Sequence, residues 1–212
     1  MILIIGNKNY SSWSMRPWVL AQHFKIPVQE IVIPLFQPGS KEKILKYSPS
    51  GKVPVLKNGK VIVWESLAIC EYLAEKFPKK NLWPKDRAAR AAARAVSSEM
   101  HAGFMNLRKA CPMNVRAKKP LPEVPPDVQK DAERIQRLWE DCRKRFGKGG
   151  DFLFGKFSIA DAMFAPVVWR FRTYGIPYAG VSEKYIRAML ALPAMKEWEK
   201  ATIAEPYVID HH

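Results

Sequence analysis

The sequence has no apolar run near the roughly 20 residues that a membrane-spanning helix requires. Its first apolar run is too short, with too little positive charge before it, to be a secretory signal. There is no internal repeat, no histidine and cysteine spacing typical of a zinc site, and no aromatic signature of RNA binding. These absences predict no membrane partner and no metal, and they argue against nucleic acid as a partner.

Cysteine is scarce. Cys70, Cys111 and Cys142 form no close pair and no CxxC motif. An odd, scattered set of this kind is typical of reduced thiols, because structural disulfides are built in oxidising compartments. We therefore expect a cytoplasmic protein.

Acidic residues are also few: the sequence contains 20 Asp and Glu and 35 Lys and Arg, which gives a net charge of +15. Such an excess attracts nucleic acid, anionic surfaces or small acidic substrates. The basic residues are spread from Lys25 to Lys200 without a dense block, so most are expected on solvated helix faces. A general attraction for anions is the inference that remains. The apolar fraction of 48% in 212 residues supports one folded domain or two small ones.

The first 78 residues alternate between strand and helix patterns. Residues 2–5 read as a buried strand, and a helix is expected to begin near Ser12 to Ser14 with Pro17 in its first turn. A second strand at 28–33 completes a βαβ unit, which implies a parallel pair of strands. A short helix is expected at 41–47.

Two short apolar runs flank Asn58-Gly59, which is the strongest short-range signal for a hairpin. Pro54 opens the first run, and Glu65-Ser66 begins a helix that ends at Pro78. The pattern predicts a compact α/β domain with a mixed sheet over residues 1–78. A polar link follows at 79–86.

From residue 87 the pattern is helical only, and we expect an all-helical domain over 87–212. Ser158 and Asp161 form a capping box that opens a nearly all-apolar, buried helix. The helices are expected at 87–110, 128–146, 159–174, 182–192 and 194–202, with a proline-rich connector at 112–126.

The turn from Tyr10 to Trp18 holds three serine hydroxyls and an arginine between a strand and a helix. Helix N-termini favour negative charge, so these hydroxyls can donate to an anion. Serine is also a preferred N-cap residue, and on local grounds capping is the simpler reading. Ser14 is expected to cap the helix, and Arg16 is expected to support the turn or form a local ion pair.

The order of motifs resembles the cytosolic glutathione transferase family over essentially the whole chain. Three matches carry the resemblance: the turn Ser11–Arg16, similar to zeta-like and other serine-type classes; Val53-Pro54 followed by Glu65-Ser66; and the capping box at Ser158. The resemblance implies the glutathione transferase fold, an α/β thioredoxin-like N-terminal domain with an all-α C-terminal domain. It also implies glutathione as co-substrate, a role in detoxification and a homodimer.

A thiol with pKa near 8.5 is mostly protonated at neutral pH, and a hydroxyl that donates to sulfur at a helix N-terminus favours the thiolate. By the resemblance, Ser11 is the predicted catalytic residue and Ser12 its rival. No cysteine lies in the turn, which argues against thioltransferase chemistry. Trp13 stands where the zeta class has a cysteine, which argues against the maleylacetoacetate isomerase activity of that class.

The resemblance implies a cis peptide bond between Val53 and Pro54, so that Val53 pairs with a peptide-like ligand as another strand would. Glu65 and Ser66 suit the ammonium and carboxylate of the γ-glutamyl group. The predicted cation for the glycyl carboxylate is Lys52. Gln37 and Lys41 are the weaker candidates for that group.

The electrophile is expected between the domains, on one face of the first long helix. The residues of this face are Met100, His101, Phe104, Met105 and Arg108, with Trp13 and Phe36 opposite. Arg108 and the basic charge favour an anionic electrophile. The predicted function is therefore glutathione transfer to small electrophiles. Its alternatives are a glutathione-dependent isomerase and a non-catalytic glutathione-binding regulatory protein.

Overall fold

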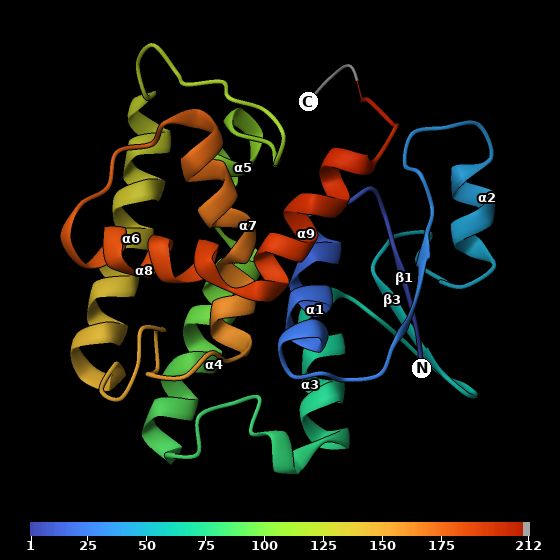
Figure 1. The fold of residues 1–212 in the computed structure, drawn as a ribbon, viewed down its shortest axis with the longest axis horizontal. Helices are drawn as coiled ribbons and strands as arrows, with labels where there is room; N and C mark the ends of the chain where they lie inside the picture. Colours follow the sequence, from blue (N-terminus) through green and yellow to red (C-terminus); the bar gives the residue numbers. More distant parts are fainter. Residues whose placement is uncertain (210–212) are drawn as a thin grey trace.

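The computed structural model describes residues 1–209 as a sheet unit and a helical unit packed side by side (Figure 1). The sheet unit has four strands in the order β2-β1-β3-β4. The strands are β1 (Ile2–Ile5), β2 (Gln29–Val32), β3 (Val55–Asn58) and β4 (Val61–Trp64). β1 runs parallel to β2 and antiparallel to β3, which confirms the predicted βαβ unit and mixed sheet.

The hairpin predicted around Asn58-Gly59 is confirmed. Asn58 is the last residue of β3 and pairs with Val61, so Gly59 and Lys60 form the two-residue turn. Gly59 has φ +61°, a conformation that glycine adopts without steric cost.

Helices cover both faces of the sheet. α1 (Ser12–His23) and α3 (Ser66–Lys76) pack on one face, and the short α2 (Ser40–Leu45) covers the other (Figure 1). This arrangement follows from alternation along β1, because Leu3 and Ile5 belong to the main core while Ile4 joins Ile44 of α2 in a second cluster. The thioredoxin-like architecture predicted from the sequence is confirmed.

One detail of α1 differs from the prediction. The helix begins at Ser12, so Pro17 lies in its second turn and not in its first. At that position the proline ring removes an N–H that would otherwise donate to the carbonyl of Trp13. The helix continues to His23 because its buried face packs against α3 and α7.

The helical unit is built around α7, in which every residue except Arg172 is buried. Its helices, preceded by a 3-10 turn at Pro78–Lys80, are α4 (Arg87–Ala102), α5 (Met105–Ala110), α6 (Pro126–Phe146), α7 (Ile159–Tyr174), α8 (Gly180–Ala191) and α9 (Pro193–Ala204). α7 contacts α1 of the sheet unit as well as α4 and α8, so one hydrophobic core runs through both units. Within residues 1–209, no helix combines the length and apolar character needed to cross a membrane.

The prediction of a single helix at 87–110 is wrong. The helix breaks at Gly103 and Phe104. Phe104 adopts the left-handed conformation with φ +61°, and its side chain is buried. A Cβ at Gly103 would lie 2.9 Å from the carbonyl oxygen of Glu99, so a larger residue there would need a shift of the backbone. The break turns α5 away from the axis of α4.

We propose that the chain divides as the sequence predicts, into residues 1–78, a link at 79–86 and a helical domain from residue 87. The link carries the 3-10 turn and Trp83, whose side chain is buried in the shared core. Residues 210–212 of the predicted helical domain lie outside the described residues.

The capping box predicted at the start of α7 is confirmed. The Asp161 carboxylate accepts from the Ser158 N–H at 2.9 Å, the Ser158 hydroxyl at 3.0 Å and the Leu153 N–H at 3.0 Å. All three residues are buried, so no water replaces these bonds when the carboxylate is removed.

We predict that Asp161→Ala lowers the free energy of unfolding by about 3 kcal/mol or more, because three buried donors lose their acceptor. Urea denaturation followed by circular dichroism measures the change. Asp151→Ala, an exposed residue in the preceding loop, is the matched control and should change stability little. Equal stability losses in the two variants would contradict the structural role of the box.

Candidate functional site

A cleft of about 290 Å³ lies between the sheet unit and α4. It brings together segments far apart in the sequence: the loop before β3, the start of α3, the first turn of α1 and the end of α4. Its lining residues are Trp13, Ser50, Lys52, Val53, Pro54, Glu65 and His101. Four of the predicted site residues, Lys52, Val53, Pro54 and Glu65, are therefore in one cleft.

The peptide bond between Val53 and Pro54 is cis. Pro54 is buried directly before β3, and Val53 is half-buried at the cleft. Among the described residues, the N–H and C=O of Val53 form no hydrogen bond. They form an unpaired edge that can take an extended ligand by main-chain hydrogen bonds.

Glu65 stands at the mouth of α3 with φ +70° and ψ 130°, an uncommon backbone conformation for a residue with a side chain. Its carboxylate is about half exposed and lies 3.8 Å from Nε2 of His101. In the part of the chain that is described, no side chain caps the first N–H groups of α3. A carboxylate and a helix N-terminus therefore lie side by side, one suited to a cation and the other to an anion.

The hydroxyl of Ser66 does not line the cleft. The residue is fully buried, and its Oγ accepts from the Arg16 guanidinium at 3.5 Å. The Ser66 hydroxyl is therefore engaged by Arg16 and is not among the groups that line the cleft.

The serine turn is buried at the start of α1. The Ser11 hydroxyl donates to Oγ of Ser14 at 2.7 Å, and the same oxygen accepts from the Gly6 N–H at 3.1 Å. Ser14 was expected to cap the helix. That prediction is wrong, because its hydroxyl ties the turn back to the end of β1. Ser11 is the N-cap residue, yet its side chain caps no N–H group of the helix.

Ser12 is the first residue of α1 and is also buried. Within residues 1–209 its hydroxyl forms no hydrogen bond. Neither Ser11 nor Ser12 is among the lining residues of the cleft, although their neighbour Trp13 is.

Trp13 is surrounded by cationic and polar groups. The guanidinium carbons of Arg16 and Arg108 lie 4.3 Å and 4.8 Å from the centre of its ring, within the range of cation–π attraction. The ring of His101 meets it edge-on at 5.1 Å. Trp13 therefore lines the cleft with two guanidinium groups against its ring.

Arg16 is fully buried where α1, α3 and α7 meet. Its Nε donates to the Met163 carbonyl at 3.2 Å, while one terminal nitrogen has no partner among the described residues. Burial lowers the pKa of Arg16 well below its usual value, and repulsion from Arg108 and Arg170 lowers it further. Its hydrogen bonds therefore go to α7 and α3 and not to the turn, and no carboxylate forms an ion pair with Arg16 within residues 1–209.

The predicted electrophile face is not formed, because the break at Gly103 and Phe104 reorients the residues beyond it. Met100 and Phe104 are buried in the core, and Met105 is exposed. Arg108 turns back and donates to the Met100 carbonyl and, at 2.8 Å, to the Gly103 carbonyl, so it closes the C-terminus of α4. Only His101 of the predicted face lines the cleft.

Three further candidates lie elsewhere. Phe36, predicted to face the electrophile, is 75% exposed and does not line the cleft. Gln37 and Lys41 are exposed on the segment around the start of α2, where the Gln37 N–H donates to the Ser40 hydroxyl at 3.1 Å. Of the candidates for the glycyl carboxylate, only Lys52 reaches the cleft.

The three cysteines are unpaired and buried. Burial raises the pKa of Cys70 and Cys142 to about 12 and that of Cys111 to about 11, so all three thiols are protonated at neutral pH. They are poor nucleophiles in this environment. Within residues 1–209, no group of histidine, cysteine and acidic residues could hold a metal ion.

His101 was placed by the sequence on the electrophile face, but its pairing with Glu65 was not foreseen. Burial lowers the pKa of His101, repulsion from Arg16 lowers it further, and the Glu65 carboxylate opposes both effects. The imidazole is therefore neutral at neutral pH.

Comparison with known proteins assigns this chain to one protein family. Two family models match it: the glutathione S-transferase N-terminal domain over residues 10–76 and the C-terminal domain over residues 125–201. Together they cover more than half of the chain.

Two curated relatives carry different names. A stringent starvation protein A homolog of Pasteurella multocida is 27% identical over 156 residues, which cover 71% of this chain and 66% of the relative. The chain thus spans just under two thirds of that relative's length. A probable maleylacetoacetate isomerase of Caenorhabditis elegans is 32% identical over 109 residues, which cover 51% of each chain.

Among solved structures, a glutathione transferase homolog from Burkholderia with bound glutathione has a TM-score of 0.72 at 23% identity. The alignment covers 96% of this chain and 98% of that structure. This likeness shows the shared fold.

We predict that Glu65→Gln lowers the pKa of His101 further, because the half-exposed carboxylate that favours the imidazolium is lost. Arg16→Met should change the same pKa in the opposite direction. Nuclear magnetic resonance titration of the imidazole signals, assigned with His101→Gln, measures both shifts. Arg94→Met, which removes an exposed arginine paired with Glu71, is the control and should leave the pKa unchanged.

Proposed function

The chain belongs to the glutathione S-transferase family, and from that premise we propose that it binds glutathione in the cleft beside α3 and transfers its thiol to small electrophiles. The observation that carries the proposal is the unpaired main chain of Val53 at the cis-proline, on the same cleft as the N-terminus of α3. A tripeptide such as glutathione has a main chain that can pair with Val53 and a carboxylate that can accept from the N–H groups at the start of α3.

Each end of glutathione has a chemical counterpart in the proposed mode. The α-carboxylate of the γ-glutamyl group accepts from the uncapped N–H groups at the start of α3, and its ammonium group pairs with the Glu65 carboxylate. The cysteinyl residue pairs with the N–H and C=O of Val53 as an added strand. Lys52 neutralises the glycyl carboxylate, while Gln37 takes no part unless its loop moves.

We propose Ser11 as the residue that stabilises the thiolate. Its hydroxyl stands at the N-cap position of α1 without capping the helix, and the Gly6 N–H continues to satisfy Ser14 if Ser11 turns to the sulfur. The rival is Ser12, whose hydroxyl forms no hydrogen bond within the described residues. The positive end of α1 favours the thiolate in both cases.

We predict that bound glutathione has a thiol pKa below the ordinary value of about 8.5, and that Ser11→Ala returns it to that value. Ultraviolet titration of the thiolate absorbance measures the pKa, and the rate of conjugation with a halonitroarene should fall about 10²-fold in the same variant. Glutathione affinity, measured by calorimetry, should change little, because binding depends on the groups at Val53 and Glu65.

Ser12→Ala is the matched control and should keep the lowered thiol pKa. The reverse result, with the pKa restored by Ser12→Ala alone, would assign the role to Ser12. An unchanged pKa in both variants would refute activation by a serine hydroxyl.

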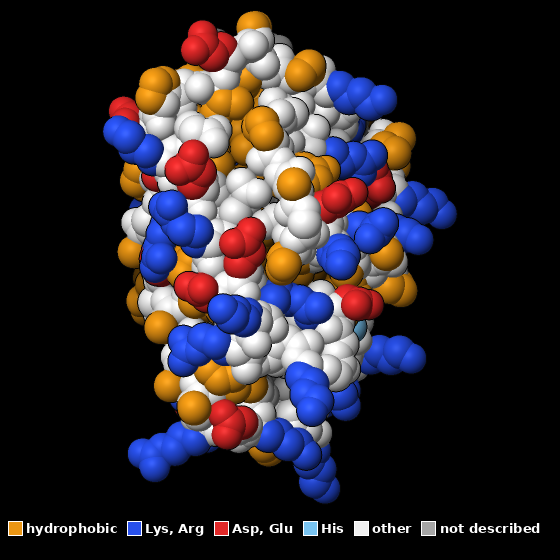
Figure 2. All heavy atoms as spheres, turned by 90° about the vertical axis from the view of Figure 1, so that its left-hand side faces the viewer, with side chains coloured by type: hydrophobic (Ala, Val, Ile, Leu, Met, Phe, Trp, Pro, Cys, Tyr) orange, Lys and Arg blue, Asp and Glu red, His pale blue; other side chains and the backbone are white. Residues whose placement is uncertain are grey.

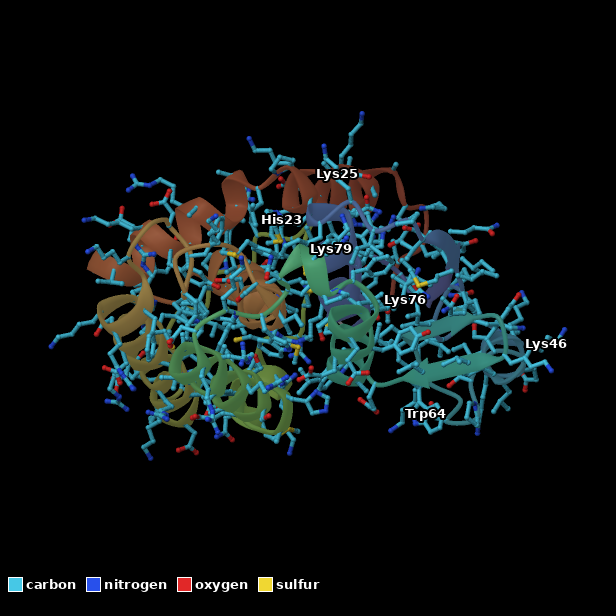
Figure 3. The ribbon with its side chains drawn as sticks, turned by 90° about the horizontal axis from the view of Figure 1, so that it is seen from below. His23, Lys25, Lys46, Trp64, Lys76 and Lys79 are labelled. Carbon is cyan, nitrogen blue, oxygen red and sulfur yellow. The ribbon has the colours of Figure 1, made fainter. Side chains whose placement is uncertain are left out.

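We further propose a homodimer formed through the free edge of β4. Val61, Ile62 and Trp64 of this strand are each about two-fifths exposed, and Figure 3 shows Trp64 on the outer side of the sheet. An apolar edge strand of this kind is a template for association. The unpaired, buried cysteines fit a reducing compartment such as the cytoplasm.

We predict that Trp64→Glu converts the dimer to a monomer, because it places a charge in an apolar interface. Sedimentation velocity measures the state of association. Val32→Glu, at the exposed edge formed by β2, is the matched control and should leave the dimer intact.

The second candidate function is an isomerase that uses glutathione without consuming it, favoured by the named isomerase among the relatives. Conversion of a cis-enedioate with full recovery of glutathione would establish it. A non-catalytic regulatory protein is the third candidate. Tight glutathione binding without a shift of the thiol pKa and without turnover would favour that role.

A further inference from the structure

A second cleft, of about 700 Å³, shares no lining residue with the candidate site. Four segments meet around it: the end of α1, the link at 79–86, the end of α6 and the loop that leads to α7. Figure 3, which views the molecule from below, labels His23 at the end of α1, one of the lining residues. Its volume is within the range of sites for small molecules.

Aromatic rings form much of the wall. His23 and Phe157 lie 4.3 Å apart, and Phe146 stacks on Phe154 at 5.6 Å. Phe24 and Trp83 also line the cleft. Burial lowers the pKa of His23, so at neutral pH it contributes a neutral ring and no charge.

Five cationic side chains surround these rings: Lys80, Lys85, Arg145, Lys148 and Lys156. In the described part of the chain none of them forms an ion pair, although Lys80 donates to the Phe24 carbonyl at 2.6 Å. One acid, Asp86, lines the cleft, and its carboxylate caps α4 by accepting from the Ala89 N–H at 2.7 Å. Figure 2 shows Lys and Arg side chains crowded over the lower part of the adjoining helical face.

The cations do not serve the fold as ion-pair partners, and their like charges repel one another around the cleft. A bound polyanion removes that repulsion. The rings can at the same time stack against a flat aromatic group.

We propose that this cleft binds a small polyanion that carries an aromatic ring, with the chemistry of a nucleoside triphosphate. The site goes beyond the proposed transferase function and is independent of it. The five cations converge on one hollow from three segments, the link, the end of α6 and the loop that leads to α7, and this geometry favours a compact ligand over an extended nucleic acid strand.

The probe is ATP, measured by isothermal titration calorimetry with the full chain at two salt concentrations. Adenosine tests the ring alone, and inorganic tripolyphosphate tests the charges alone. We expect ATP to bind at least about tenfold more tightly than either fragment, with affinity that falls as salt rises.

The double variant Lys85→Gln/Lys156→Gln should weaken ATP binding about tenfold or more, and Phe154→Leu should weaken ATP without changing tripolyphosphate binding. The control Lys46→Gln/Lys57→Gln removes the same charge from exposed positions of the sheet unit, and Figure 3 shows Lys46 far from His23. Thermal melting checks that each variant is folded. Glutathione binding should be equal in all of them.

Three results would overturn the proposal. The first is that ATP does not bind the parent protein. The second is that the control variant loses as much affinity for ATP as the double variant, which would show a diffuse effect of charge. The third is that a single-stranded oligonucleotide binds more tightly than ATP and displaces it, which would assign the surface to nucleic acid. Loss of glutathione binding alone would refute the transferase proposal and leave this site unaffected.

Discussion

A buried positive charge at the junction of three helices is the constraint on which the geometry of the candidate site depends. Arg16 has no ion-pair partner among the described residues, and its desolvation is offset by contacts with the Met163 carbonyl, the Ser66 hydroxyl and the face of Trp13. These contacts join the starts of α1 and α3 to α7 at Met163. Because a buried charge tolerates few arrangements, the two helix N-termini are held in one relative position.

The serine turn is fixed from the opposite side by the helical unit. The Glu205 carboxylate accepts from the N–H groups of Lys8 and Asn9 at 2.9 Å and 3.1 Å, and the Asn9 side chain donates to that of Asn114 at 2.9 Å. Groups more than a hundred residues away therefore orient the turn. This is preorganisation in the physical sense, since the hydroxyl at Ser11 is positioned by bonds that exist before any ligand arrives.

Local patterns predicted the parts of the fold that local forces determine. The hairpin at Asn58-Gly59 and the capping box at Asp161 depend on residues two or three positions apart, and both were confirmed. The role of Ser14 was misjudged because its partner, Gly6, lies eight residues back. The prediction of the electrophile face was wrong for a similar reason. Helical periodicity predicted one continuous helix through Gly103, but the helix breaks there. The Arg108 guanidinium then donates to the carbonyl groups that the break leaves without helical partners.

The charge of +15 consists of groups with opposite consequences for the fold. Arg16 and Arg170 are buried, and burial and mutual repulsion with Arg108 lower their pKa values, that of Arg170 to about 10. Hydrogen bonds to backbone carbonyl oxygens offset part of the desolvation cost of these two arginines. The bond from Arg16 to Met163 also links the sheet unit to the helical unit. Of the cations around the second cleft, four are exposed and Lys80 is partly buried with its Nζ on the Phe24 carbonyl, and none forms an ion pair within the described residues. A surplus of exposed positive charge that converges on a hollow is therefore explained better by an anionic ligand than by stability.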